Sequence, residues 1–204
     1  GDWYKFYVEK TGVYEIDTAF LNALGVNTSN IQPDQIEILS HGGKMLPLLN
    51  AENEYYDPPE IPIQIIGGGD SSFDPGDKIR FFATATEGEY DPENDTHLNL
   101  YADRAYYYIT VNGNNGKRIL SFSQPSGQIS DVVDTFNDNQ YYEVDEFSPS
   151  LVGRKWYGDR FDIETEQTYG FDFPNIITAN PLRVSVRAAA IADNDTNMEV
   201  SVNG

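Results

Sequence analysis

The sequence predicts a mainly β fold built as two β-sandwich-like modules, the first of which also carries a short helix. Short segments in which aromatic and β-branched residues alternate with polar ones recur along the chain, and clusters of Gly, Asn, Asp and Pro separate them. The 204 residues include 14 Tyr and 11 Phe, which supply large apolar surfaces although only 39% of the chain is hydrophobic. A single segment has the spacing of an amphipathic helix.

The first module is expected to cover residues 1–125. Segments 3–8 and 13–16 alternate on either side of Gly12, so residues 3–16 are predicted to form a hairpin. A helix is predicted over 18–24, with Asp17 as its N-cap and Gly25 just after its end. Further strands are predicted at 35–39, 61–66, 77–83, 105–111 and 118–122.

The second module is expected to cover residues 126–204, after a linker at 124–128. Its predicted strands lie at 140–144, 154–157, 169–173, 182–187 and 198–202. These are fewer than the roughly seven strands of a sandwich, and the sequence stops at Asn203-Gly204, a preferred hairpin turn. We therefore expect a second module that is incomplete at its C-terminal end. We also expect the chain to be a piece of a longer protein, because it starts abruptly and carries no signal peptide.

The acidic composition excludes several functions. The chain has 13 Lys+Arg against 33 Asp+Glu, a net charge of −20. That charge argues against nucleic-acid binding, where Lys and Arg supply most of the affinity, and against an anionic membrane surface. No apolar segment reaches the length of about 18 residues that membrane insertion needs. The sequence has no Cys and two His, which excludes a cysteine nucleophile, disulfides and both cysteine-based and three-histidine zinc sites.

Three acidic loops could bind calcium, because alternating oxygen donors in a loop can wrap this ion. None fits the twelve-residue calcium loop: counted from Asp91, the sixth position is Thr96 rather than Gly. The favoured interpretation is that these Asp and Asn residues start turns through their side-chain oxygens. Calcium therefore stays the alternative, and no other cofactor is predicted. The candidate ligands in the first two loops are Asp70, Asp74, Asp77, Asp91, Glu93 and Asp95, and residues 193–197 resemble them.

The sequence gives little support for a catalytic, sugar-binding or phosphate-binding site. Paired carboxylates could hydrolyse glycosides, but with 33 carboxylates some pair will reach a suitable separation by chance. Exposed Tyr and Trp could stack on sugars, although Tyr in a β chain more often packs on strand faces. His41 and His97 are isolated in turn-like sequence, and no nucleophile-elbow motif accompanies them. Gly67–Gly69 lacks the Lys-Ser/Thr of a phosphate-binding loop and is interpreted as a turn.

Residues 153–159 concentrate cations and aromatic rings in this acidic chain. An Arg over Trp156 or Tyr157 could form a cation–π contact of about 0.5–2 kcal/mol. The favoured interpretation is that these residues pack and form ion pairs where the two modules join. The functional interpretation is that they form a docking surface for a partner. The candidate interaction residues are Arg154, Lys155, Trp156 and Tyr157.

Five segments occur together in an order and spacing that resembles one family. They are residues 3–16, 41–47, 73–83, 97–101 and 153–158. In these segments the chain is similar to the N-terminal, non-catalytic region of PorU, the sortase family of the type IX secretion system of Bacteroidetes. The resemblance spans essentially the whole chain.

The resemblance implies a gingipain-type cysteine peptidase domain C-terminal to such a region. The family removes C-terminal sorting domains from secreted cargo and attaches the cargo to surface lipopolysaccharide. It acts at the outer-membrane surface with the shuttle protein PorV. No catalytic residue can be assigned in this chain, because the sequence contains no Cys.

The leading hypothesis is therefore a non-enzymatic scaffold and docking region of a cell-surface sortase, with its own peptidase domain and PorV as partners. The alternative is a calcium-stabilised adhesion or carbohydrate-binding β-sandwich. A small hydrolase that uses paired carboxylates is a third, weaker hypothesis.

Overall fold

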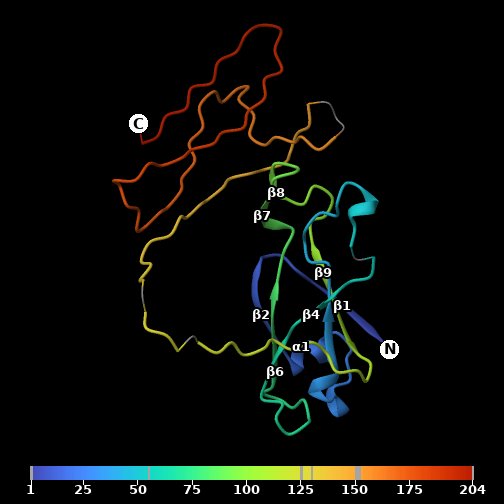
Figure 1. Cartoon of the computed structure of the whole chain (residues 1–204). Helices are drawn as coiled ribbons and strands as arrows, with labels where there is room; N and C mark the ends of the chain where they lie inside the picture. The colour runs from blue at the N-terminus through green and yellow to red at the C-terminus, as the bar shows by residue number, and fades with distance from the viewer. Residues whose placement is uncertain (1, 55, 125, 130, 150–152, 204) are drawn as a thin grey trace. The chain divides into compact units, whose positions relative to one another are not determined.

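The computed structural model describes residues 2–54, 56–124, 126–129, 131–149 and 153–203. The chain divides into two units, residues 1–127 and 128–204. All labelled strands and the helix α1 lie in the blue-to-green part of the chain, within the first unit (Figure 1). The mainly β fold predicted from the sequence is confirmed.

The first unit contains two larger antiparallel sheets and one small one. The first sheet has the order β1-β9-β3-β4, formed by Trp3–Val8, Ala105–Val111, Ile36–Leu39 and Glu60–Ile61. The second has the order β2-β6-β5, formed by Gly12–Asp17, Lys78–Ala83 and Gln64–Ile66. A two-stranded sheet pairs β7 (Glu87–Asp91) with β8 (Thr96–Leu98).

The two larger sheets share one core. In β9, Tyr107 and its neighbours two positions away are buried, and β6 likewise buries alternate residues such as Phe81. The rings of Phe81 and Tyr107 lie 5.8 Å apart between centroids, and Phe6 of β1 contacts both. The period of two that identifies strands in the sequence therefore also places one face of each sheet in the core.

The predicted hairpin at 3–16 is wrong, although both of its strands exist. β1 pairs with β9 in the first sheet, whereas β2 pairs with β6 in the second. Phe6 and Val8 of β1 and Ile16 of β2 are all buried in the shared core. Strands in opposite sheets can bury these side chains against each other, so the connection at 9–11 crosses between the sheets instead of folding back within one.

The predicted strand at 61–66 is also divided between the sheets. Glu60–Ile61 forms β4 and Gln64–Ile66 forms β5. Pro62 lies at the break, where it cannot donate a ladder hydrogen bond. Ile63 is fully buried and forms an isolated parallel bridge with Arg118. Apart from this bridge, the predicted strand at 118–122 does not form.

The predicted helix is confirmed as α1, Thr18–Ala23. The Asp17 side chain accepts a hydrogen bond from the Phe20 N–H at 2.8 Å, as expected of an N-cap. Gly25 adopts a positive φ of 92°. The N–H groups of Gly25 and Val26 donate back into the last turn of the helix, which is the Schellman arrangement. Three short 3₁₀ helices complete the helical elements: Thr28–Asn30, Pro33–Gln35 and Asn50–Glu52.

The described residues of the second unit form no regular strand or helix. The five strands predicted there are not formed, and Phe147 and Tyr157 make an isolated antiparallel bridge. The apolar positions of the predicted strands at 182–187 and 198–202 stay about half exposed. Their alternation marks extended chain, but a strand also needs a neighbouring strand to complete its hydrogen-bond ladder.

Candidate functional site

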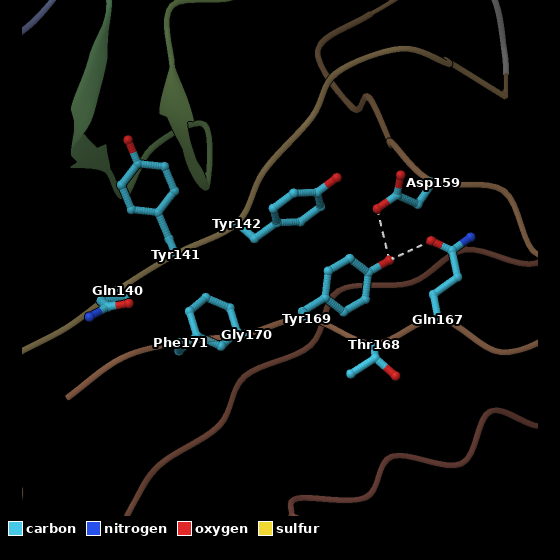
Figure 2. A pocket seen from close by; sticks show the side chains of 9 residues that line it. All are labelled: Gln140, Tyr141, Tyr142, Asp159, Gln167, Thr168, Tyr169, Gly170 and Phe171. Atoms are coloured by element: carbon cyan, nitrogen blue, oxygen red, sulfur yellow. Dashed lines mark hydrogen bonds between the residues drawn. The ribbon is translucent and has the colours of Figure 1, made fainter. Parts of the chain in front are cut away.

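Aromatic side chains of the second unit line an open hollow. Its volume is about 530 Å³. Four of its nine lining residues are aromatic, and the others supply amide, hydroxyl and carboxylate groups (Figure 2). The lining residues are Gln140, Tyr141, Tyr142, Asp159, Gln167, Thr168, Tyr169, Gly170 and Phe171.

Tyr169 is the centre of the polar contacts in this hollow. Its hydroxyl lies 2.8 Å from Asp159 Oδ2 and 3.0 Å from Gln167 Oε1, as Figure 2 shows. The hydroxyl has one proton, and the charged carboxylate is the stronger acceptor. Partial burial and the Asp159 carboxylate raise the pKa of Tyr169 to about 12. Tyr169 therefore stays a neutral phenol throughout the physiological pH range.

The second tyrosine, Tyr142, packs beside Tyr169. Their ring centroids lie 4.8 Å apart at an interplanar angle of 41°. A hydrogen bond to Asp159, followed by burial, raises the pKa of Tyr142 as well. Asp159 thus orients the Tyr169 phenol, and the resulting surface offers ring faces next to hydrogen-bonding groups. Such a surface suits a neutral ligand that is rich in hydroxyl groups, and the carboxylate disfavours an anion.

The Gln140 side chain fixes one wall of the hollow through two hydrogen bonds to the backbone of Asp172, as a neighbouring strand would. The Gln140 amide donates to the Asp172 carbonyl, and the Asp172 N–H donates to Gln140 Oε1 at 3.2 Å. This hollow is not apparent from the sequence. Tyr142 and Tyr169 are 27 positions apart, and with 14 Tyr in the chain no sequence signal distinguishes this pair.

The predicted interaction residues Arg154–Tyr157 do not line the hollow. Tyr157 pairs with Phe147 through two backbone hydrogen bonds of 2.7 and 2.8 Å. The Trp156 indole N–H donates to the Gly153 carbonyl at 3.2 Å, and this side chain stays partly exposed. The guanidinium of Arg160 lies 4.6 Å from the centre of the Phe147 ring. Whether residues 154–157 bind a partner stays a prediction.

The acidic loops of the first unit use their carboxylates to form turns. Asp70 accepts a hydrogen bond from the Ser72 N–H at 3.1 Å, and Asp77 accepts one from the Asp74 N–H at 2.8 Å. Asp91 opens the β7–β8 turn, because its Oδ1 accepts from the N–H groups of two following residues. Among the described residues, no group of three or more His, Asp or Glu side chains is placed to hold a metal ion. Calcium binding by these loops stays the untested alternative.

His97 packs its ring 5.1 Å from that of Tyr90, and His41 is exposed. Within the part of the chain that the structure describes, no helix is long and apolar enough to cross a bilayer.

Comparison with known proteins gives a structural likeness only. No family model and no curated protein matches the chain. Among solved structures, the crystal structure of dimeric latent PorU from Porphyromonas gingivalis matches with a TM-score of 0.54 and 22% sequence identity. The match covers 78% of this chain and 14% of the PorU chain. At this identity the likeness concerns the fold, so the chain has a PorU-like fold, and the match spans a small part of the PorU chain.

Proposed function

We propose that this chain is a non-catalytic scaffold and docking region of a PorU-type sortase at the cell surface. The fold match carries the proposal, because it covers 78% of the chain but only 14% of PorU. The five sequence segments that resemble the same family support it independently. The absence of Cys from the chain also agrees, since a cysteine peptidase must then carry its nucleophile elsewhere.

In this role the first unit supplies rigidity and the second supplies contacts. The shared core of the two larger sheets fixes the positions of the strands. Residues 154–157 of the second unit combine Trp, Tyr and Arg, the residue types that dominate protein interfaces. The proposed partners are the peptidase domain of the same sortase and a PorV-type shuttle protein. Such a region would hold the peptidase and its cargo together while the peptidase removes sorting domains.

Binding of the purified chain to each proposed partner tests this role. The peptidase domain and the shuttle protein from the same organism would be immobilised separately, and binding would be measured by interferometry. We expect saturable binding to at least one partner and a loss of about tenfold or more in R154A or W156A. R183A is the matched control, because Arg183 is an exposed arginine of the same unit outside residues 154–157.

The proposal fails if neither partner binds while circular dichroism shows the chain to be folded. It also fails if the purified chain alone cleaves a sorting-domain peptide. A R154A or W156A variant that unfolds would instead assign these residues to packing.

The aromatic hollow favours a second function, carbohydrate binding. Tyr142 and Tyr169 offer ring faces beside Asp159 and Gln167, which matches the needs of a neutral sugar. A glycan array probed with the wild type and with Y169A tests it. Signals that disappear in Y169A support a sugar site, and a blank array with the folded wild type rejects it.

A further inference from the structure

The outer face of the first sheet carries an exposed group of aromatic rings and cations. Side chains on a strand alternate between the two faces of its sheet. The residues of β1 and β9 that do not face the core therefore gather on the other side, in register with one another. We call this group the aromatic–cation face; it consists of Trp3, Lys5, Tyr7, Arg104, Tyr106 and Tyr108.

The rings of this face are exposed although they contact each other. Trp3, Tyr7 and Tyr106 are 53%, 44% and 40% exposed. Trp3 meets Tyr108 edge-on at 5.8 Å, and Tyr7 meets Tyr106 edge-on at 6.3 Å between centroids. These contacts limit the motion of the rings, so binding a partner would cost little additional side-chain entropy.

Both cations of this face are held by rings instead of carboxylates. The Lys5 ammonium lies 3.6 Å from the centre of the Tyr106 ring, and the Arg104 guanidinium lies 4.3 Å from that of Tyr7. By contrast, Lys44, Lys78 and Arg80 each form an ion pair with a glutamate. Within the described ranges, Lys5 and Arg104 have no carboxylate partner, in a chain with 33 acidic residues. A cation–π contact positions a cation but leaves its charge uncompensated.

Glu37 of β3 is the carboxylate in register with β9 in this sheet, and among the described residues it forms no ion pair with Lys5 or Arg104. Glu37 on β3 is in register with Thr110 of β9, and its Oε2 accepts a hydrogen bond from the Asn112 amide at 2.9 Å. Because Lys5 and Arg104 contact rings and form no ion pair within the described ranges, both cations can pair with an incoming carboxylate.

We propose that the aromatic–cation face binds a protein partner that presents carboxylates together with apolar side chains. Trp, Tyr and Arg are the residue types that dominate binding energy in protein interfaces, and the uncompensated charges select an acidic partner. Two cations are too few for the clusters of four to eight that bind anionic lipids, or for the basic runs that bind heparin. Binding here is independent of the proposed sortase role, because it depends on side chains of β1, β9 and the residue before β9 alone.

A displayed library of random twelve-residue peptides, selected on the immobilised full chain, tests this proposal. We expect the recovered peptides to be enriched in Asp or Glu together with aromatic or aliphatic residues. The dissociation constant of the best peptide should weaken by about tenfold or more in K5Q/R104Q. It should also weaken when NaCl is raised from about 50 to about 500 mM, because salt screens exposed charges.

Two variants serve as controls. K44Q removes an exposed lysine that is paired with Glu89, and should change binding less than about twofold. K5R/R104K keeps both charges and should retain binding within about threefold, which separates lost charge from lost folding. Melting curves establish that each variant is folded.

Several outcomes would overturn the proposal. One is the recovery of no peptides, or of peptides without acidic enrichment. Another is equal binding of the peptides by the folded K5Q/R104Q variant. Binding of heparin or of phosphatidylglycerol vesicles that is lost in K5Q/R104Q, with no peptide binding, would assign the face to a polysaccharide or a membrane instead.

Discussion

Replacing Tyr107 with Phe tests the hydrogen bonds that tie the two larger sheets together. Tyr107 lies on β9 of the first sheet and is 0% exposed. Its hydroxyl donates to the Thr84 carbonyl oxygen at 3.0 Å and accepts from the Thr84 N–H at 2.8 Å. Thr84 follows β6 of the second sheet directly, so a single phenol satisfies two backbone groups of the opposite layer.

The expected loss of stability is worked out from the interactions that Tyr107→Phe removes. Phe keeps the ring and its contacts with Phe6 and Phe81, so the hydrophobic contribution is unchanged. Each lost hydrogen bond contributes about 0.5–1.5 kcal/mol, and a buried group left without a partner costs about 1–3 kcal/mol. Thr84 is half-buried, so water can compensate in part. We expect Tyr107→Phe to lower the free energy of unfolding by about 2–3 kcal/mol.

Urea unfolding at 25 °C, followed by fluorescence and circular dichroism, measures this loss. The matched control is Tyr106→Phe on the adjacent position of β9, where the side chain is 40% exposed; we expect a change within about 0.5 kcal/mol. The slope of the unfolding free energy against urea should stay the same, because the exposed area on unfolding hardly changes. A loss below about 0.5 kcal/mol for Tyr107→Phe would refute the proposed link between the sheets.

Three further measurements address the polar groups of the first unit. Thr110 is buried and its hydroxyl has no hydrogen-bond partner among the described residues, so Thr110→Val should raise stability by up to about 1 kcal/mol. Thr96→Val is the control and should lower stability, because the Thr96 hydroxyl accepts from the Leu98 N–H at 3.0 Å; urea unfolding distinguishes the two. Hydrogen bonds from Lys78 and Arg80 lower the pKa of Glu15 from 4.5 to about 2. The stability that ionised Glu15 contributes is thus present above pH 4.5 and lost as the pH falls towards 2. The difference in unfolding free energy between wild type and Glu15→Gln should therefore shrink over that interval. A difference that stays constant would contradict the role of these hydrogen bonds. Finally, millimolar Ca²⁺ should leave the melting temperature unchanged relative to EDTA, because the acidic loops use their carboxylates in turns, and a clear rise would restore the calcium hypothesis.

Local signals predicted α1 and the strands that bury one face in the first unit. Asp17 and Gly25 delimit α1 because each acts on backbone groups within a few residues of its own position. Alternation located β1, β2, β6 and β9 because one face of each strand is buried. Periodicity reports burial and not the identity of the neighbouring strand. It therefore could not show that β1 and β2 belong to different sheets.

The β7–β8 hairpin was missed for a related reason. Four of the five residues of β7 are exposed, so this strand has no buried face to produce alternation. Its turn was interpreted as an acidic loop, and the Asp91 carboxylate does cap that turn. The chemistry of the turn was thus recognisable, whereas the strands beside it were not.

The aromatic–cation face and the aromatic hollow depend on contacts between residues that are far apart in the sequence. A single sequence does not reveal such contacts. The aromatic–cation face brings together β1 and β9, about 100 positions apart, and its composition follows only once their register is known. The aromatic hollow likewise depends on the approach of Tyr142 to Tyr169. By contrast, the cations and aromatic rings at 154–157 are adjacent in sequence, which is why composition alone identified them.

Site-specific photo-cross-linking tests the proposed docking role most directly. A photoreactive amino acid would replace Trp156 in the protein expressed in its own cells, with Arg183 as the control position, and cross-linked peptides would be identified by mass spectrometry. The docking role predicts cross-links from position 156 to a PorV-type shuttle protein or to the gingipain-type peptidase domain, and few from position 183. Equal labelling from both positions, or cross-links from position 156 to neither partner, would contradict it.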